Sequence, residues 1–148
     1  MKISTRGRYA VRILLDIALH QDQGFVSMKD VARRQQISKK YSDQIGMQLS
    51  QAGLLLAARG RQGGYKLIPE ARDVTVLRVL NIMEGSLAPV QCLEPGPAGC
   101  GRCGFCATLP LWTGFSRLMN DYFGSITLQS LIDQAPPQPE LTDLPVPD

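Results

Sequence analysis

The chain has 148 residues, and 44% of them are hydrophobic, which allows one domain of ordinary size with a packed core and excludes a disordered protein. No run approaches roughly eighteen consecutive apolar residues, so the sequence predicts no membrane span. The net charge of +3 is unevenly distributed. Residues 1–66 contain twelve Lys or Arg against four Asp and no Glu, a net of +8, whereas residues 67–148 contain four Arg against nine acids, a net of −5. The basic half suits a polyanion such as nucleic acid.

Hydrophobic periodicity predicts three helices in the basic half. Apolar residues recur at helical spacing over residues 7–20. Ser27 precedes a short helix over residues 28–35, and Ser38 precedes another that runs to about residue 52; serine is a favoured N-cap. Two capped helices joined by a tight turn are typical of a helix-turn-helix.

A β-hairpin is expected next. The apolar run 54–58 and the segment Tyr65-Lys-Leu-Ile68 have the composition of strands, and a basic turn lies between them. This turn contains Gly63-Gly64, and glycine supplies the positive φ that tight hairpin turns need. Because an isolated two-stranded hairpin is barely stable, it must pack against the helices, as the wing of a winged helix does.

The acidic half predicts a helix over residues 76–83 after Thr75, a long helix over 109–123, and a short helix after Thr127. We therefore expect a mainly α-helical protein with a small β-hairpin wing. Its expected parts are a winged helix-turn-helix domain (1–84), a cysteine loop (85–108), a dimerisation helix with a C-terminal helix (109–134) and a disordered, proline-rich acidic tail (135–148).

The long helix carries two neighbouring apolar stripes. One consists of Leu111, Phe115, Leu118 and Tyr122, and the other of Trp112, Met119 and Phe123. One stripe suffices for packing on the chain's own domain, so two indicate contact with a second subunit, although a wholly buried core helix would have the same pattern. We expect a homodimer with contacts from Trp112, Phe115, Met119 and Phe123.

All four cysteines fall within fifteen residues, as Cys92-x7-Cys100-x2-Cys103-x2-Cys106. Gly and Pro residues surround them, and such a loop can fold several soft thiolates around one metal centre. This ferredoxin-like spacing predicts an iron–sulfur cluster, with [4Fe-4S] favoured and [2Fe-2S] possible. Structural zinc, a thiol switch and disulfides remain alternatives. No signal peptide is recognised, so we expect a reducing cytoplasm, which favours metal binding over disulfides.

Four segments resemble the IscR/NsrR-type iron–sulfur transcription regulators. They are Lys2-Ile-Ser-Thr-Arg-Gly-Arg-Tyr-Ala-Val-Arg12, Ile37-Ser-Lys-Lys-Tyr41, Arg59-Gly-Arg-Gln-Gly-Gly-Tyr65 and Leu111-Trp112, and the resemblance spans roughly residues 1–134. It implies a homodimeric winged-helix regulator, with repression as the expected mode, whose cluster loop precedes a dimerisation helix. Such regulators sense redox state, nitric oxide or iron and cluster status, and they are not enzymes. A cluster-bearing electron carrier would leave the basic half and the wing unexplained.

The cluster ligands implied by this resemblance match only in part. IscR-like members have three Cys and one His before the Leu-Trp pair, whereas Leu109 takes the His position here. NsrR-like members use an acid near the N-terminus of the partner subunit, but this chain has Arg8 there. The additional Cys103 is therefore expected to supply the fourth ligand, beside Cys92, Cys100 and Cys106.

The predicted partner is double-stranded DNA with a pseudo-palindromic operator. The second helix of the pair enters the major groove in this class, which places Asp43 and Gln44 near base edges. Tyr41 has packing between the two helices as an alternative role. Arginines at the wing tip suit the negative potential of a minor groove, and the start of the first helix suits the DNA backbone. The candidate DNA-binding residues are Thr5, Arg6, Arg8, Tyr9, Ser38, Lys39, Lys40, Tyr41, Asp43, Gln44, Arg59 and Arg61.

Overall fold

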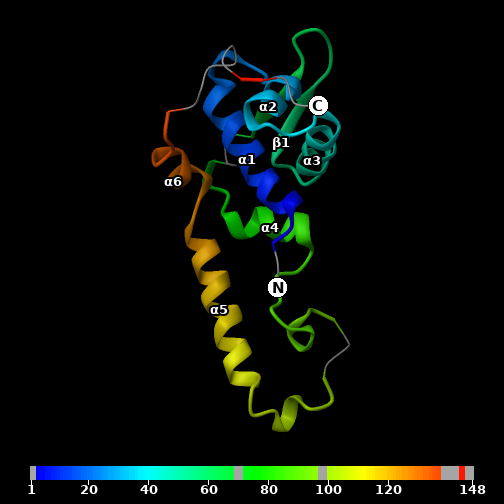
Figure 1. The fold of residues 1–148 in the computed structure, drawn as a ribbon, viewed down its shortest axis with the longest axis vertical. Coiled ribbons are helices and arrows are strands. Elements are labelled where there is room, and N and C mark those ends of the chain that lie inside the picture. The colour runs from blue at the N-terminus through cyan, green and yellow to red at the C-terminus, as the bar shows by residue number, and fades with distance from the viewer. Residues whose placement is uncertain (1–2, 69–71, 97–99, 138–143, 146–148) are drawn as a thin grey trace.

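A long first helix, α1 (Thr5–His20), lies at the centre of the head of the molecule. The head also contains α2 (Met28–Gln35), α3 (Lys39–Gln51), a β-hairpin and α4 (Val76–Glu84), which pack around α1 (Figure 1). The structure, a computed structural model, describes residues 3–68, 72–96, 100–137 and 144–145. The inward stripe of α1 is fully buried: Ala10, Ile13, Leu14 and Ile17.

Local capping chemistry determines where these helices begin. The hydroxyl of Ser27 accepts a hydrogen bond from the Lys29 amide at 3.2 Å, and that of Ser38 accepts one from the Tyr41 amide at 3.4 Å. Both helix starts were expected from the sequence and are confirmed. Between α2 and α3, Gln36 has a φ of 53°, which makes the tight turn of the helix-turn-helix.

The wing is a two-stranded antiparallel sheet made of β1 (Leu55–Ala58) and β2 (Gly64–Leu67). Val26 pairs with Tyr65 on the other side of β2, through hydrogen bonds of 2.8 and 2.9 Å. This approach requires Gly64, because a Cβ there would lie 2.3 Å from the Val26 carbonyl oxygen. The wing is therefore fixed to the segment that leads into α2.

The remaining helices connect the head to the cysteine loop. Helix α4 ends at Glu84, and Gly85 (φ 80°) follows it as the C-cap. The loop then runs away from the head to the start of α5 (Leu109–Ser125), at the far end of the molecule (Figure 1). The C-terminal helix α6 (Leu128–Asp133) returns to the head, where Leu128 is buried against the core around α1. Short 3₁₀ turns complete the described elements: Gln21–Gln23, Gln91–Leu93 and Cys103–Phe105.

The two stripes of α5 do not divide as the sequence suggested. Met119 is 7% exposed and packs with α4, and Phe123 is partly buried against the same cluster. Met119 and Phe123, which were expected to contact a second subunit, therefore pack against the chain's own α4. The other stripe is the exposed one: Leu111, Phe115, Leu118 and Tyr122 are 44–70% exposed, and Trp112 is 36% exposed. The helix is not a wholly buried core helix.

Much of the predicted tail lies outside the described residues. Two of its described residues contact the helix-turn-helix: the Leu144 carbonyl accepts hydrogen bonds from Arg33 at 3.0 and 3.2 Å, and the Pro145 carbonyl accepts one from Gln36 at 2.9 Å. Among the described residues, no helix has the length and apolar character needed to cross a membrane.

Candidate DNA interface and cysteine loop

A cleft between the start of α1 and the exposed face of α3 brings four of the twelve predicted DNA-contacting residues together. Thr5 and Arg6 form one wall, and Tyr41 and Gln44 belong to the other. Sequence reasoning missed several lining residues, although two of them lie three and four positions after Gln44 on the same helix face. The missed residues are Ser4, Ile45, Met47 and Gln48.

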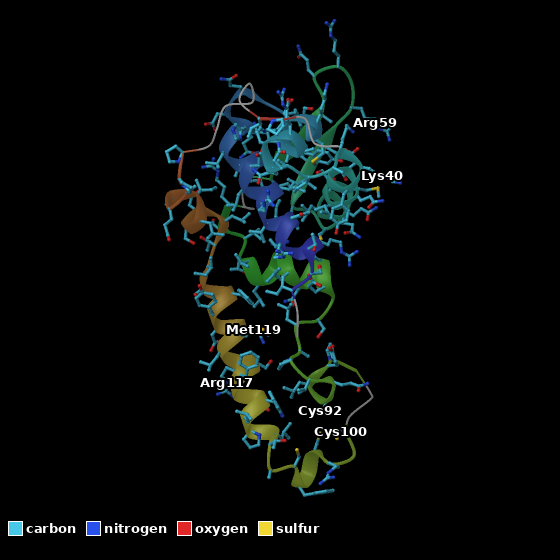
Figure 2. The ribbon with its side chains drawn as sticks, in the orientation of Figure 1. Lys40, Arg59, Cys92, Cys100, Arg117 and Met119 are labelled. Carbon is cyan, nitrogen blue, oxygen red and sulfur yellow. The ribbon has the colours of Figure 1, made fainter. Side chains whose placement is uncertain are left out.

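Two of the predicted base and phosphate contacts pair with each other on the surface of α3. The Lys39 ammonium lies 2.6 Å from the Asp43 carboxylate, one helical turn away, and both side chains are exposed. Lys40 has no such partner among the described residues and points away from the core (Figure 2). Lys39 therefore occupies one carboxylate oxygen of Asp43, and the other oxygen has no hydrogen-bond partner among the described residues.

Tyr41 packs between helices. Its ring meets the Tyr9 ring edge-on, with 5.9 Å between centroids, and both rings pack against the core. The Arg12 guanidinium lies over the Tyr9 ring at 5.1 Å and also donates to the side chain of Gln35. Tyr41 thus has a packing role, although its ring partner lies on α1 and not on the other helix of the pair, and Tyr9, predicted as a DNA-backbone contact, takes part in the same packing.

A buried ion pair fixes α2 on α1. Asp16 is 2% exposed and accepts hydrogen bonds from Arg34 at 2.7–3.1 Å and from the Gln35 amide at 2.8 Å. Such a pair tolerates burial because each lone pair has a donor. Asp16 only interrupts an apolar stretch in the sequence, and nothing local identifies Arg34 as its partner.

The wing presents its arginines to solvent. Arg59 and Arg61 are both exposed around Gly60, whose φ of 106° makes the turn. Within the described residues, neither guanidinium has a hydrogen bond or an ion pair. Arg59 and Lys40 lie on the same side of the head in the view of Figure 2. Both arginines are therefore available to an anionic partner.

The four cysteines are free thiols on the loop between α4 and α5, and Figure 2 labels two of them, Cys92 and Cys100. The pKa of the Cys103 thiol is raised by desolvation and by the charges of Cys100 and Cys92. The pKa of Cys106 is lowered by hydrogen bonds from Thr108, whose hydroxyl oxygen is 3.4 Å from the sulfur. Within the described ranges, no group of three or more Cys, His, Asp or Glu is arranged to hold a metal ion. Four soft donors on one loop suit iron or zinc chemically.

Comparison with known proteins identifies the family. The sequence model of the Rrf2 family, described as iron-dependent transcriptional regulators, matches residues 3–134. The chain belongs to the Rrf2 family. It is 39% identical over 135 residues to protein rrf2 of Nitratidesulfovibrio vulgaris (Hildenborough), covering 91% of this chain and 89% of that protein.

Solved structures of Rrf2-like regulators have the same fold. CymR, named as the global cysteine regulator of B. subtilis, superposes with a TM-score of 0.76 at 30% identity, covering 92% of this chain and 99% of that one. IscR of T. potens superposes with a TM-score of 0.71 at 32% identity, covering 92% of this chain and 89% of that one. The winged helix-turn-helix prediction is thereby confirmed. This Rrf2 protein is a transcriptional regulator, not an enzyme, and DNA is its expected partner.

Proposed function

We propose that this Rrf2 regulator represses transcription as a homodimer on a pseudo-palindromic operator, and that an iron–sulfur cluster in the cysteine loop controls its DNA affinity. One observation carries the proposal: all four thiols lie on the loop that joins α4, which packs on α1, to α5, which has an exposed apolar stripe. Cys92, Cys100, Cys103 and Cys106 would hold the cluster, which supplies a redox- and nitric oxide-sensitive centre when bound.

The apolar stripe supports the homodimer. Leu118 is 70% exposed and Tyr122 is 64% exposed, on a helix that also exposes Leu111 and Phe115. Soluble monomers rarely expose so continuous an apolar surface, and a second copy of α5 would cover it. Sedimentation of the purified protein tests this: a dimer at micromolar concentration is expected, and a stable monomer would disprove it.

The ligand assignment has its own test. Because a hydroxyl does not replace a thiolate on iron, Cys103→Ser is expected to lose most iron and the visible absorption of the anaerobically purified protein. The same substitution at Cys92, Cys100 or Cys106 serves as the positive control. Full iron content in Cys103→Ser would mean that the fourth ligand lies elsewhere.

A second candidate keeps the regulator but makes the loop a zinc site or a thiol switch. The likeness to CymR of Staphylococcus aureus, one of whose solved structures is named as an oxidised form, supports the thiol switch. Metal analysis after anaerobic purification separates the two candidates. Iron with acid-labile sulfide supports the cluster, whereas a colourless protein with stoichiometric zinc, or with no metal and a reversible disulfide, supports the alternative.

A further inference from the structure

The last residue of α4 is hydrogen-bonded to the start of α1. One carboxylate oxygen of Glu84 accepts a hydrogen bond from the Ser4 hydroxyl at 2.6 Å and another from the Ser4 amide at 3.1 Å. Beside it, the Arg6 guanidinium donates to the Met83 carbonyl at 2.9 Å. Arg6 is an exposed residue, but the bonds themselves are partly buried, so water competes with them less than it would on an open surface.

The sequence of α1 leaves space for this contact. Gly7 is buried, and a Cβ at that position would lie 2.3 Å from the Glu84 carboxylate and 3.1 Å from the Leu80 side chain. The Ser4 hydroxyl has two functions, because it donates to Glu84 and also accepts the Gly7 amide at 3.1 Å as the N-cap of α1. The carboxylate therefore holds the residue that sets where α1 begins.

Both sides of this contact lead to a candidate functional region. On one side, Ser4 and Arg6 line the cleft that also contains Gln44 of α3. On the other side, the cysteine loop begins directly after Glu84, and its Leu87 is buried against Leu80 and Met119. The loop thus meets the chain at the same helix end that holds the DNA-facing start of α1.

We propose that Glu84 is a positioning residue that couples the state of the cysteine loop to the shape of the DNA-facing cleft. The inference rests on the proposed function. A rearrangement of the loop moves the end of α4. Because Ser4 donates hydrogen bonds to Glu84 and Arg6 donates one to Met83, this movement shifts Ser4 and Arg6 relative to α3. Loop state and DNA affinity are then linked by a coupling free energy that passes through one carboxylate.

The test is the ratio of operator dissociation constants between the cluster-free and cluster-loaded forms, measured anaerobically. Glu84→Ala removes the acceptor, and Glu84→Asp keeps the charge but shortens its reach to Ser4. In both variants we expect the ratio to fall to within about twofold of unity, from the fivefold or greater ratio that is typical of allosteric coupling. Glu84→Gln retains an acceptor oxygen of the same reach and is expected to keep the wild-type ratio.

Asp73→Ala is the matched control, since Asp73 is an exposed carboxylate just before the opposite end of α4. It is expected to leave the ratio unchanged. In the cluster-free protein, amide exchange at Gly7 is expected to be faster in Glu84→Ala and Glu84→Asp than in wild type, because Ser4 is then held less firmly.

Two outcomes are decisive. If Glu84→Ala and Glu84→Asp both bind iron and keep the wild-type ratio, Glu84 does not couple the two regions. If the wild-type protein binds its operator equally well with and without the cluster, the proposed cluster control is refuted, and the coupling role of Glu84 with it.

Discussion

Alanine substitutions at two adjacent residues of α5 distinguish folding from association, because Met119 faces the chain's own α4 and Leu118 faces outward. Met119 is 7% exposed, and truncating a buried methionine to alanine costs about 2–5 kcal/mol. The cluster around it is small, with Val76, Leu80 and Leu87 as its other buried members, so we expect the lower part of that range, about 2–3 kcal/mol. For a chain of this length, this lowers Tm by about 5–10 °C.

Leu118→Ala has a different expected effect. The side chain is 70% exposed, and burial of a whole leucine contributes about 2 kcal/mol, so covering the remaining area contributes about 1.4 kcal/mol per copy. Two copies in a symmetric dimer lose about 3 kcal/mol, which raises the dimer dissociation constant roughly a hundredfold. Sedimentation measures the dimer, and thermal unfolding at several protein concentrations separates folding from association. The reasoning fails if Met119→Ala weakens the dimer as much as Leu118→Ala while leaving Tm unchanged.

The other predictions concern DNA, the buried ion pair and the thiols. Gln44→Ala is expected to lose about 1–3 kcal/mol of binding free energy on the operator alone. Arg59→Ala is expected to weaken binding to operator and scrambled duplex alike, and to reduce the slope of log affinity against log salt concentration by about one unit. DNA titrations of both variants over a salt series compare these effects. Asp16→Ala leaves a buried guanidinium unpaired and is expected to destabilise the fold by about 3–5 kcal/mol in urea unfolding. In metal-free protein near neutral pH, Cys106 is expected to react with iodoacetamide before Cys103, because the pKa of Cys106 is lowered, the pKa of Cys103 is raised, and the thiolate is the reacting form. Mass spectrometry shows the order of reaction, and the reverse order would contradict these thiol environments.

Local chemistry explains what could be predicted from the sequence. Four of the expected helices begin directly after a Ser or Thr whose hydroxyl accepts a hydrogen bond from a backbone amide two or three residues later. These caps are Ser27, Ser38, Thr75 and Thr127. Helix α1 begins two residues earlier than expected, because Ser4 is its cap and Gly7 lies inside it.

Contacts between distant segments could not be predicted. A period of 3.6 residues places Leu118 and Met119 on neighbouring stripes, but the path of the cysteine loop decides which stripe meets α4. Glu84 and Ser4 are eighty positions apart, and although Ser4 lies in a segment that resembles the family, nothing in the sequence indicates that Glu84 is its partner. The mutual arrangement of the thiols likewise depends on a loop with no regular hydrogen-bond ladder, so spacing alone predicts the donors and not their geometry.

Helices α4 and α5 form two sides of a triangle. They are joined at one corner, where the Val76 amide donates to the Ile126 carbonyl at 2.9 Å and Thr75 pairs with Thr127, and the cysteine loop is the third side. With nine residues, α4 is about 13.5 Å long, so a change of 1 Å in the length spanned by the loop turns α4 by about 4° about that corner. If the two α5 helices of a symmetric dimer are held together at the two-fold axis, the two heads turn in opposite senses relative to each other. The distance between the two α3 helices then changes by the sum of both movements, and on the proposed two-part operator the spacing of the half-sites becomes the quantity to which the loop is matched.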